Sequence, residues 1–350
     1  MNDDNVPDDL PEDGLDDAAE AAAEAAENAE RAEMKAAKAR SRAESQEQRR
    51  TKPAGYRAGF VALVGQPNAG KSTLLNAILN EKLSIVSAKP QTTRQRVTGI
   101  LNRDEAQIVF VDSPGTLKST SGINTFLQQE VADVMKKADV VCALLAADAS
   151  EDSVKDLLNQ LERGSTPWIA VVTKIDILGG TRTPMFFNHL VDNKIPFVSI
   201  TTSKRQKEAV EEVLSRVIPM LPEAVAPLYD EDLYTTQTVR QIVAEFVREA
   251  CFDRLQQEIP YGLAVRVQEF NEEGPVVKIR CELLLDKENH KSIVIGAGGA
   301  TIKAIGVTAR PQIERFLGQK VFLELHVAVQ EGWTKNPRIM KELGYVVAKE

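Results

Sequence analysis

The pattern of apolar and polar positions divides the chain into three parts. Between residues 56 and 225, short apolar runs of the kind that form buried strands alternate with stretches whose apolar residues recur at helical spacing. This alternation predicts an α/β domain with a mixed or parallel sheet. From residue 239 onward, longer runs alternate polar and apolar positions, which predicts half-buried strands and an α+β domain. Residues 1–55 carry no apolar stripe that a core could bury.

Local composition gives the boundaries between these parts. The N-terminal segment is acidic and rich in Ala, and we expect it to be disordered or marginally helical. Residues 219–232 are rich in Pro, Asp and Glu, as is typical of a linker. We therefore predict an extension over 1–55, a first domain over 56–225, a linker over 226–238, a second domain over 239–335 and a C-terminal tail over 336–350.

The most informative motif follows the first apolar run, Phe60–Val64. The next residues read G-x-x-x-x-G-K-S, and Thr73–Leu79 then has helical spacing, so the motif has the strand-loop-helix context of a phosphate-binding P-loop. Glycines let backbone N–H groups turn toward phosphates, and the helix N-terminus adds partial positive charge. Lys71 would reach the β- and γ-phosphates, and the Ser72 hydroxyl would ligate magnesium. The predicted phosphate-binding residues are Gly65, Gln66, Pro67, Asn68, Ala69, Gly70, Lys71, Ser72 and Thr73.

A second apolar run, Gln107–Val111, ends in the sequence D-S-P-G. The carboxylate of Asp112 can hold magnesium through water, and the Gly115 amide can sense a γ-phosphate. We therefore add Asp112, Ser113, Pro114 and Gly115 to the predicted phosphate site. Between the two motifs, residues 84–97 form a polar stretch with the length of a switch loop, in which a threonine could ligate magnesium when the γ-phosphate is present.

A third apolar run, Trp168–Val172, ends in T-K-I-D. The carboxylate of Asp176 can accept two hydrogen bonds from guanine, whereas adenine offers no such donor pair, and the Lys174 stem can lie along the base. A fourth run, 197–203, leads into a polar loop whose backbone N–H could meet the guanine O6. Each motif alone is weak, but all four in this order predict a GTP site. The predicted guanine-binding residues are Thr173, Lys174, Asp176, Thr201 and Thr202.

These motifs resemble those of the TrmE–Era–EngA class of translation-associated GTPases. The resemblance implies that Thr93, rather than Thr92, is the magnesium-linked switch residue and that Asn68 assists potassium-dependent hydrolysis. It assigns catalytic roles to Lys71, Thr93, Gly115 and Asn68, metal binding to Ser72, Thr93 and Asp112, and Mg²⁺ and K⁺ as cofactors. Thr173 departs from the usual N-K-x-D motif, because threonine keeps a hydroxyl but has a shorter reach than asparagine.

The C-terminal third contains G-x-x-G at residues 296–299, in a strand-loop-helix setting. If residues 239–254 form the first helix, the expected order of elements is α-β-β-α-α-β, which resembles a type II KH domain. Such domains clamp about four nucleotides against the glycine loop, although an isolated G-x-x-G is more often only a turn. Relatives often carry lysines inside this loop, whereas this chain has Ala297 and Gly298 there. The predicted RNA-binding residues are Lys291, Ile295, Gly296, Ala297, Gly298, Gly299 and Lys303.

Residues 56–346 as a whole resemble the bacterial Era family. The resemblance implies a GTP-hydrolysing assembly factor that binds GTP and GDP, contacts 16S ribosomal RNA near its 3′ end and promotes maturation of the 30S subunit. It also implies a cytoplasmic monomer with peripheral association at the inner face of the membrane. Two alternatives remain open: a slow GTP-gated RNA-binding switch with little turnover, and a tRNA-modification GTPase of the TrmE kind, which the KH-like C-terminus disfavours.

Charge and cysteine content change this picture little. Residues 1–50 hold 15 acidic and 7 basic side chains, so the whole net charge of −8 lies there and the remaining 300 residues are neutral. The basic residues of this segment all lie in residues 31–50, where RNA contact is an alternative to simple solvation. The three cysteines are far apart, so neither a disulfide framework nor a zinc site is expected. No apolar run is long enough to span a membrane, and the acidic N-terminus does not read as a secretory signal.

Overall fold

The computed structural model describes residues 52–87, 89, 92–115, 123–178, 186–200 and 206–345. The described residues from 55 onward form one compact unit. Most of the predicted N-terminal extension lies outside the described residues, so its disorder stays a prediction.

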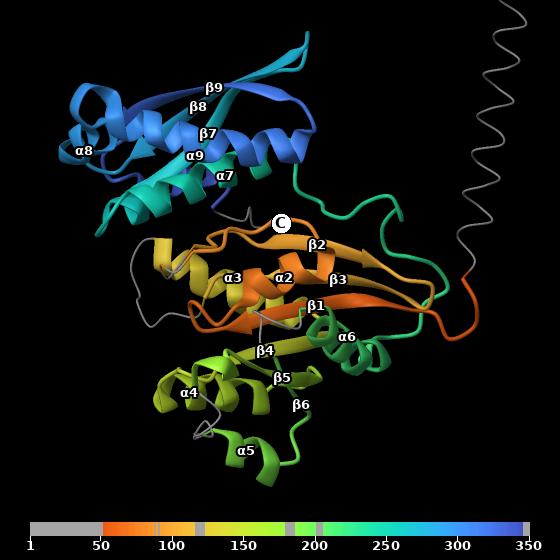
Figure 1. Ribbon diagram of the computed structural model, residues 1–350. Helices are drawn as coiled ribbons and strands as arrows, with labels where there is room; N and C mark the ends of the chain where they lie inside the picture. Colours follow the sequence, from red (N-terminus) through yellow and green to blue (C-terminus); the bar gives the residue numbers. More distant parts are fainter. Residues whose placement is uncertain are drawn as a thin grey trace, which may run out of the picture. The chain divides into compact units, whose positions relative to one another are not determined.

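Six strands form the first sheet, in the order β2-β3-β1-β4-β5-β6 (Figure 1). All neighbouring strands are parallel except β2, which runs antiparallel to β3. The central strand β4 is buried along its whole length, as expected for an apolar run covered on both faces. The strands are β1 (Arg57–Gly65), β2 (Val97–Asn102), β3 (Ala106–Asp112), β4 (Val140–Ala146), β5 (Trp168–Thr173) and β6 (Phe197–Ser199).

Helices cover both faces of this sheet. Successive strand residues point to opposite faces. Leu63 belongs to the apolar cluster that includes α2 and α6, and Ala62 to the cluster on the other face, which includes α3, α4 and α5. This arrangement confirms the predicted α/β domain. The helices are α2 (Lys71–Leu79), α3 (Ile123–Lys137), α4 (Glu151–Glu162), α5 (Phe187–Asp192) and α6 (Gln206–Val217).

Three strands form a second sheet, in the order β7-β8-β9. Strands β7 and β8 are antiparallel, and β8 and β9 are parallel. Helices α7 and α9 contribute their apolar residues to the core against this sheet. The elements follow one another in the predicted α-β-β-α-α-β order, which confirms the α+β fold. They are α7 (Val239–Arg254), β7 (Leu263–Asn271), β8 (Val276–Leu285), α8 (Lys291–Ile295), α9 (Ala300–Leu317) and β9 (Lys320–Val329).

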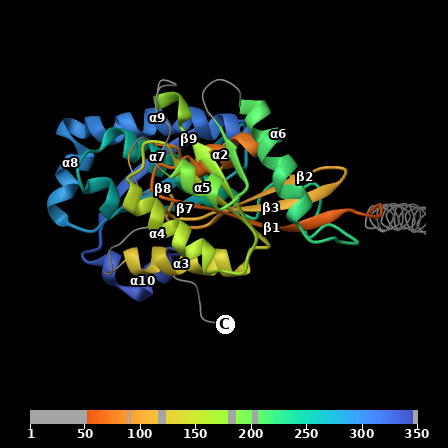
Figure 2. The ribbon, with the colours of Figure 1, turned by 90° about the horizontal axis from the view of Figure 1, so that it is seen from below.

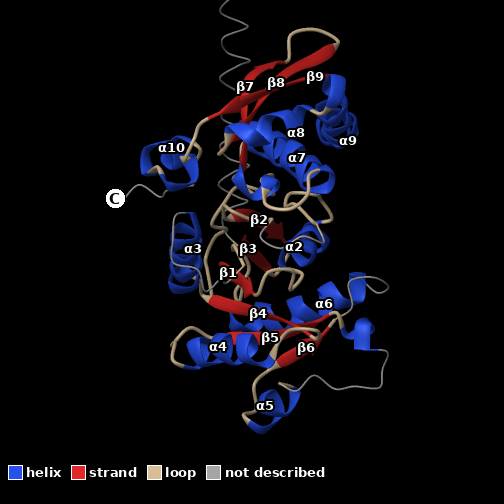
Figure 3. Cartoon of the chain, turned by 90° about the vertical axis from the view of Figure 1, so that its left-hand side faces the viewer, coloured by secondary structure: helices blue, strands red, loops and turns tan. Residues whose placement is uncertain are grey.

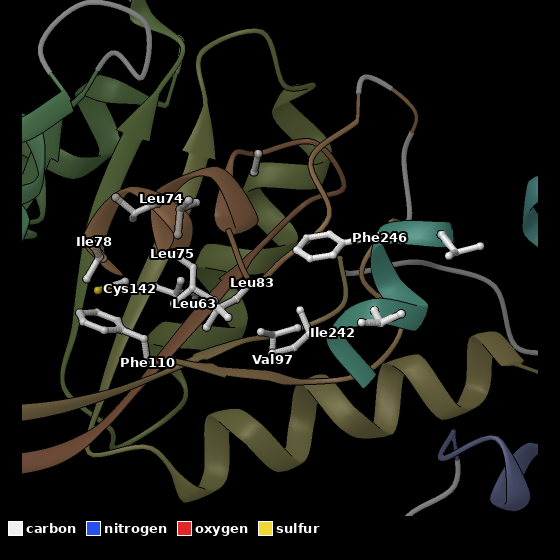
Figure 4. Packing of buried hydrophobic residues seen from close by; sticks show 14 of the residues in the cluster. Leu63, Leu74, Leu75, Ile78, Leu83, Val97, Phe110, Cys142, Ile242 and Phe246 are labelled. Carbon is white, nitrogen blue, oxygen red and sulfur yellow. The ribbon is translucent and has the colours of Figure 1, made fainter. Parts of the chain in front are cut away.

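The cores of the two sheets are continuous through α7. Figure 4 shows Ile242 and Phe246 of α7 beside Leu83 and Val97, which precede and begin strand β2, and all four belong to one buried cluster. Helix α7 therefore packs against the segment that joins α2 to β2. This contact positions the predicted switch loop, described below.

The connections outside the sheets are also ordered. The segment between α6 and α7 runs along β2, where the Ile100 N–H donates to the Tyr234 carbonyl at 2.9 Å and the Thr235 hydroxyl donates to the Thr98 carbonyl at 2.6 Å. This segment therefore covers the edge of the first sheet at β2, which would otherwise be open to solvent. Part of the predicted tail forms helix α10 (Pro337–Glu342), which lies beside α3 (Figures 2 and 3) and shares a small apolar cluster with it.

Among the described helices, none alone is long and apolar enough to cross a membrane, and one bent pair, Glu288–Ile295 with Ala297–Leu317, meets the length and composition test together.

Candidate nucleotide-binding site

The P-loop connects the end of β1 to the start of α2, as its sequence predicts. Its turn requires left-handed backbone at Gly65 (φ 154°), Asn68 (φ 60°) and Gly70 (φ 91°). A Cβ atom on Gly65 would lie 2.4 Å from the carbonyl oxygen of Leu144, so only glycine fits there. The motif glycines are therefore explained by backbone geometry before any ligand is considered.

Lys71 lies buried at the start of α2. Its Nζ donates to the carbonyl oxygens of Gly65 at 3.1 Å and Gln66 at 2.9 Å, and it forms no ion pair with any described residue. Burial lowers the pKa of Lys71 from 10.5 to about 8, although Asp112 opposes the shift. Among the described residues, this buried cation hydrogen-bonds only to carbonyl oxygens, so a phosphate group would complete the site.

Three predicted metal ligands come together above the loop. The Ser72 hydroxyl lies 3.0 Å from that of Thr93 and donates to Asp112 Oδ2 at 2.7 Å, and Thr93 Oγ1 is 3.5 Å from the same oxygen. A fourth member, Ser84, was not predicted from the sequence; its hydroxyl donates to Asp112 Oδ2 at 3.1 Å. Thr92 is the other switch threonine, and its carbonyl instead accepts a bond from Arg248.

This cluster suits magnesium chemically. Magnesium prefers oxygen ligands, and the cluster offers hydroxyl and carboxylate oxygens only. Asp112 Oδ1 is buried without a hydrogen-bond partner, which leaves one carboxylate oxygen unused by the protein. Burial raises the pKa of Asp112, while Lys71 and the neighbouring hydroxyls act in the opposite direction. Within the described residues, no group of His, Cys, Asp and Glu side chains forms another metal site.

The D-S-P-G segment meets the P-loop directly. A Cβ atom on Gly115 would lie 2.8 Å from the nitrogen and 2.9 Å from the Cα of Pro67, so the two backbones touch. Ser113 is turned away from the phosphates, because both its N–H (3.3 Å) and its hydroxyl (2.7 Å) donate to the Leu63 carbonyl. Within this motif, Asp112 and Gly115 lie at the site, whereas Ser113 links the end of β3 to β1.

The guanine side of the site is built around Thr173. Its buried hydroxyl donates to the Ala69 carbonyl at 2.8 Å and ties the end of β5 to the P-loop. The shorter reach of threonine is thus sufficient for a tie within the chain. Lys174 (φ 59°) contacts Asp148 at 3.2 Å, and Asp176 lies in the short helix Ile175–Leu178. The predicted Thr201 and Thr202 lie outside the described residues.

A pocket of about 390 Å³ joins these parts. Some of the described predicted residues do not line it, namely Gly65, Gln66, Ala69, Asp112, Ser113, Pro114 and Asp176. Three residues before the switch threonines line it and were missed as site residues. The pocket is lined by Pro67, Asn68, Gly70, Lys71, Ser72, Thr73, Ile85, Val86, Ser87, Thr92, Thr93, Gly115, Thr173 and Lys174.

The G-x-x-G loop connects helix α8 to helix α9, so the strand expected before the loop is wrong: residues 291–295 form a short helix. A Cβ atom on Gly296 (φ 76°) would lie 2.3 Å from the Thr301 hydroxyl, so the first glycine is required by the start of α9. Gly298 and Gly299 also have positive φ but face open space. Lys291 pairs with Glu288 at 3.9 Å. The RNA-binding residues predicted from sequence thus surround a loop with accessible backbone.

A shallow pocket of about 350 Å³ lies beside this loop, between α9 and β9. Lys303 lines it, as do Arg310, Val307 and Phe322, which were not predicted. Val307 and Phe322 are 58% and 59% exposed, so this pocket presents two neighbouring large apolar side chains to solvent. The sequence did contain one indication of this pocket: Phe322 is a large apolar residue at a position of the alternating strand that faces away from the core. Bases stack on such surfaces, and flanking cations attract phosphates.

Comparison with known proteins assigns both halves of the chain. The model of a 50S ribosome-binding GTPase family matches residues 60–174, and that of the KH domain matches residues 258–334. GTPase Era of Thermoanaerobacter sp. (strain X514) is 36% identical over 300 residues, covering 85% of this chain and 99% of the relative. The chain belongs to the Era family of GTPases. It is therefore a GTP-hydrolysing enzyme with a C-terminal KH domain, as predicted.

Other Era proteins agree with this assignment. GTPase Era of Neisseria meningitidis serogroup A is 40% identical over 294 residues, covering 83% of this chain and 95% of the relative. An Aquifex aeolicus Era variant bound to GDP.AlF4- is similar in structure, with a TM-score of 0.77 and 33% identity over 83% of this chain and 100% of its own. Era in complex with MgGDPNP and nucleotides 1506–1542 of 16S ribosomal RNA has a TM-score of 0.75 and 32% identity over the same shares. These relatives and the KH domain favour Era over the TrmE alternative.

Proposed function

We propose that this GTPase acts in assembly of the small ribosomal subunit, binding GTP with Mg²⁺ in its first domain and the 3′ region of 16S ribosomal RNA through its KH domain. The main support is the similarity, over both domains, to the Era structure that holds MgGDPNP and a 16S RNA fragment. The combination of the Ser72–Thr93–Asp112 cluster with an accessible glycine loop is consistent with this function.

Each residue of the nucleotide site has a defined task in this proposal. Lys71 contacts the β- and γ-phosphates in place of its present carbonyl partners, and Ser72, Thr93 and Asp112 hold Mg²⁺, Asp112 through water. When bound there, Mg²⁺ would neutralise the charge that develops as the γ-phosphoryl group passes to water and GDP departs. Gly115 presents its amide near the γ-phosphate. Asn68 supports a K⁺ ion that supplies further positive charge, which the family resemblance suggests.

On the RNA side, backbone binding replaces the lysines that relatives carry inside the loop. Gly298 and Gly299 leave room for a sugar-phosphate chain, and Lys303 and Arg310 supply charge beside it. Phe322 offers a face on which a base can stack. The cytoplasmic location, the monomeric state and peripheral membrane association remain predictions from resemblance.

The RNA role can be tested with a matched pair of glycine substitutions. Gly298 (φ 58°) and Gly318 (φ 67°) stand at opposite ends of α9, both left-handed and both facing open space. Asp tolerates this conformation better than most residues. Gly298→Asp places a negative charge beside the RNA phosphates and should weaken binding about tenfold, roughly 1.4 kcal/mol, whereas Gly318→Asp should not.

The assay is binding of an oligonucleotide from the 3′ end of 16S RNA at fixed salt, since phosphate contacts are salt-sensitive. Equal binding by both variants would remove the loop from the RNA site. GTP turnover with and without small subunits then tests the ribosomal role. Turnover that stays near zero in both cases would favour the slow switch over an assembly GTPase.

A further inference from the structure

The described residues of the switch segment, 82–87, 89 and 92–96, contact the C-terminal domain at several points. The segment's first contacts are made with Glu249, a buried residue of α7. The Lys82 ammonium pairs with Glu249 Oε2 at 2.6 Å, and the Val86 N–H donates to Glu249 Oε1 at 3.1 Å. Both carboxylate oxygens are thus occupied by the segment, which fixes its beginning against α7.

The middle of the segment holds the end of the same helix. The ammonium of Lys89 donates to the carbonyl oxygens of Phe252 and Leu255, in the last turn and at the C-cap of α7. Carbonyl groups at a helix C-terminus lack intrahelical partners and carry partial negative charge, so a lysine is well matched there.

Two arginines make contacts on either side of Thr93. The Arg248 guanidinium of α7 donates to the Thr92 carbonyl, while Arg94 donates to the carbonyls of Leu263 (2.7 Å), Tyr261 (2.8 Å) and Pro260 (3.0 Å). Both arginine side chains are buried.

No described carboxylate lies within ion-pair distance of Arg94. Its guanidinium hydrogen-bonds to carbonyls at the start of β7 and just before it, and it also interacts with the Tyr345 side chain. A buried guanidinium is costly unless its donors are satisfied. Separating the switch segment from the start of β7 would therefore break the three hydrogen bonds that Arg94 donates to carbonyl oxygens.

We propose that the KH domain forms part of the GTPase site, with Arg94 and Arg248 as positioning residues that hold Thr93 in reach of the magnesium. Two described residues of the segment, Ser84 and Thr93, belong to the Ser72–Asp112 cluster, and Thr93 is the one predicted to bind the metal. Fixing the backbone on both sides of it removes the need to order the loop when GTP binds. The inference rests on the proposed role of Thr93 as a metal ligand.

A positioning role for Arg94 and Arg248 has a consequence that a purely structural role would not have. We call the contacts of Arg94 and Arg248 on either side of Thr93 the clamp. Because Thr93 contributes only when a γ-phosphate is present, loss of the clamp should weaken binding of a GTP analogue and leave GDP binding unchanged. By linkage, the analogue should in turn strengthen the contact between the two domains.

The test uses the full chain with Arg94→Gln and Arg248→Gln. The matched control is Arg96→Gln, because Arg96 lies two residues further on and pairs with Glu130 and Asp133 of α3 rather than with the KH domain. Dissociation constants for GDPNP and GDP are measured at several Mg²⁺ concentrations, together with GTP turnover. We expect about tenfold weaker GDPNP binding and a higher Mg²⁺ requirement in the two clamp variants only.

A double-mutant cycle with Thr93→Ala separates the possible outcomes. If Arg94 acts through Thr93, adding Arg94→Gln to Thr93→Ala should have no further effect on GDPNP affinity. Additive effects, an equal loss of GDP and GDPNP affinity, or unchanged GDPNP affinity would each overturn the clamp. If Thr93→Ala alone leaves the Mg²⁺ requirement unchanged, the proposed metal site fails as well. Should Arg94→Gln not bind GDP, Arg94→Lys, which keeps the charge but not the three-carbonyl fit, repeats the measurement.

Discussion

The hydroxyl of Thr173 offers a sensitive test of how the guanine side of the site is held. Thr173→Val replaces this hydroxyl by a methyl group of similar size, so packing is preserved while the bond to the Ala69 carbonyl is lost. Both residues are at most 1% exposed. Water therefore cannot replace the lost donor without local rearrangement.

The expected cost follows from this burial. Leaving a buried acceptor unpaired costs about 1–3 kcal/mol. For a domain of 150–250 residues, each kcal/mol lowers the melting temperature by roughly 2–4 °C. We therefore expect Tm to fall by roughly 2–12 °C. If the missing hydrogen bond costs about 2–3 kcal/mol and half of this cost destabilises only the GDP-bound state, the bound state loses about 1.4 kcal/mol. GDP should then dissociate about tenfold faster, since 1.4 kcal/mol is a factor of ten.

Two further substitutions at this position make the test specific. Thr173→Ser keeps the hydroxyl and loses a methyl group, so it should lose some stability but retain the parental GDP dissociation rate. Thr173→Asn restores the residue usual in the motif and should also retain the tie. The assays are urea unfolding and stopped-flow release of fluorescent GDP. Parental stability and release rate in Thr173→Val would refute the reasoning, as would equally fast release from Thr173→Ser.

Three other substitutions test separate parts of the site. Asp176→Asn should weaken GDP by roughly 1.5–3 kcal/mol and improve xanthine nucleotides in competition binding; unchanged GDP affinity would contradict the guanine assignment. Gly296→Ala should lower the urea midpoint far more than Gly298→Ala, because only the first Cβ would overlap Thr301; similar midpoints would argue against that packing. Between about pH 8 and pH 10.5, unfolded Lys71 holds a proton that the buried side chain has released. The nucleotide-free chain should therefore gain roughly 3 kcal/mol of stability across this window relative to Lys71→Met, and parallel pH profiles in urea unfolding would contradict the burial of a charged lysine.

Much of the nucleotide site was predictable because its motifs are local. The P-loop places Lys71 and Ser72 at the start of a helix through a few residues of strained backbone, and the glycines that allow this are visible in the sequence. Asp112 and Gly115 follow directly from the end of an apolar strand. Parallel strands bring these ends to one edge of the sheet, so the order of the motifs was enough to group them.

Contacts between distant segments were not predictable in the same way. Ser84 joins Asp112, and Thr173 reaches Ala69, because the path of the chain brings these side chains within hydrogen-bond distance. Ser113 belongs to a phosphate motif by sequence, yet its donors face Leu63 because of the direction in which β3 ends.

Local patterns along the chain were enough to predict the order of elements, the P-loop and the two domains, since each depends on local spacing and on backbone conformations that only glycine adopts easily. Tertiary structure decided how the switch segment is held. Arg94 looks like an ordinary loop arginine in the sequence, and its role depends on three carbonyl oxygens more than 160 residues away. A hydrogen bond depends on distance and direction in space, which no local pattern along the chain encodes.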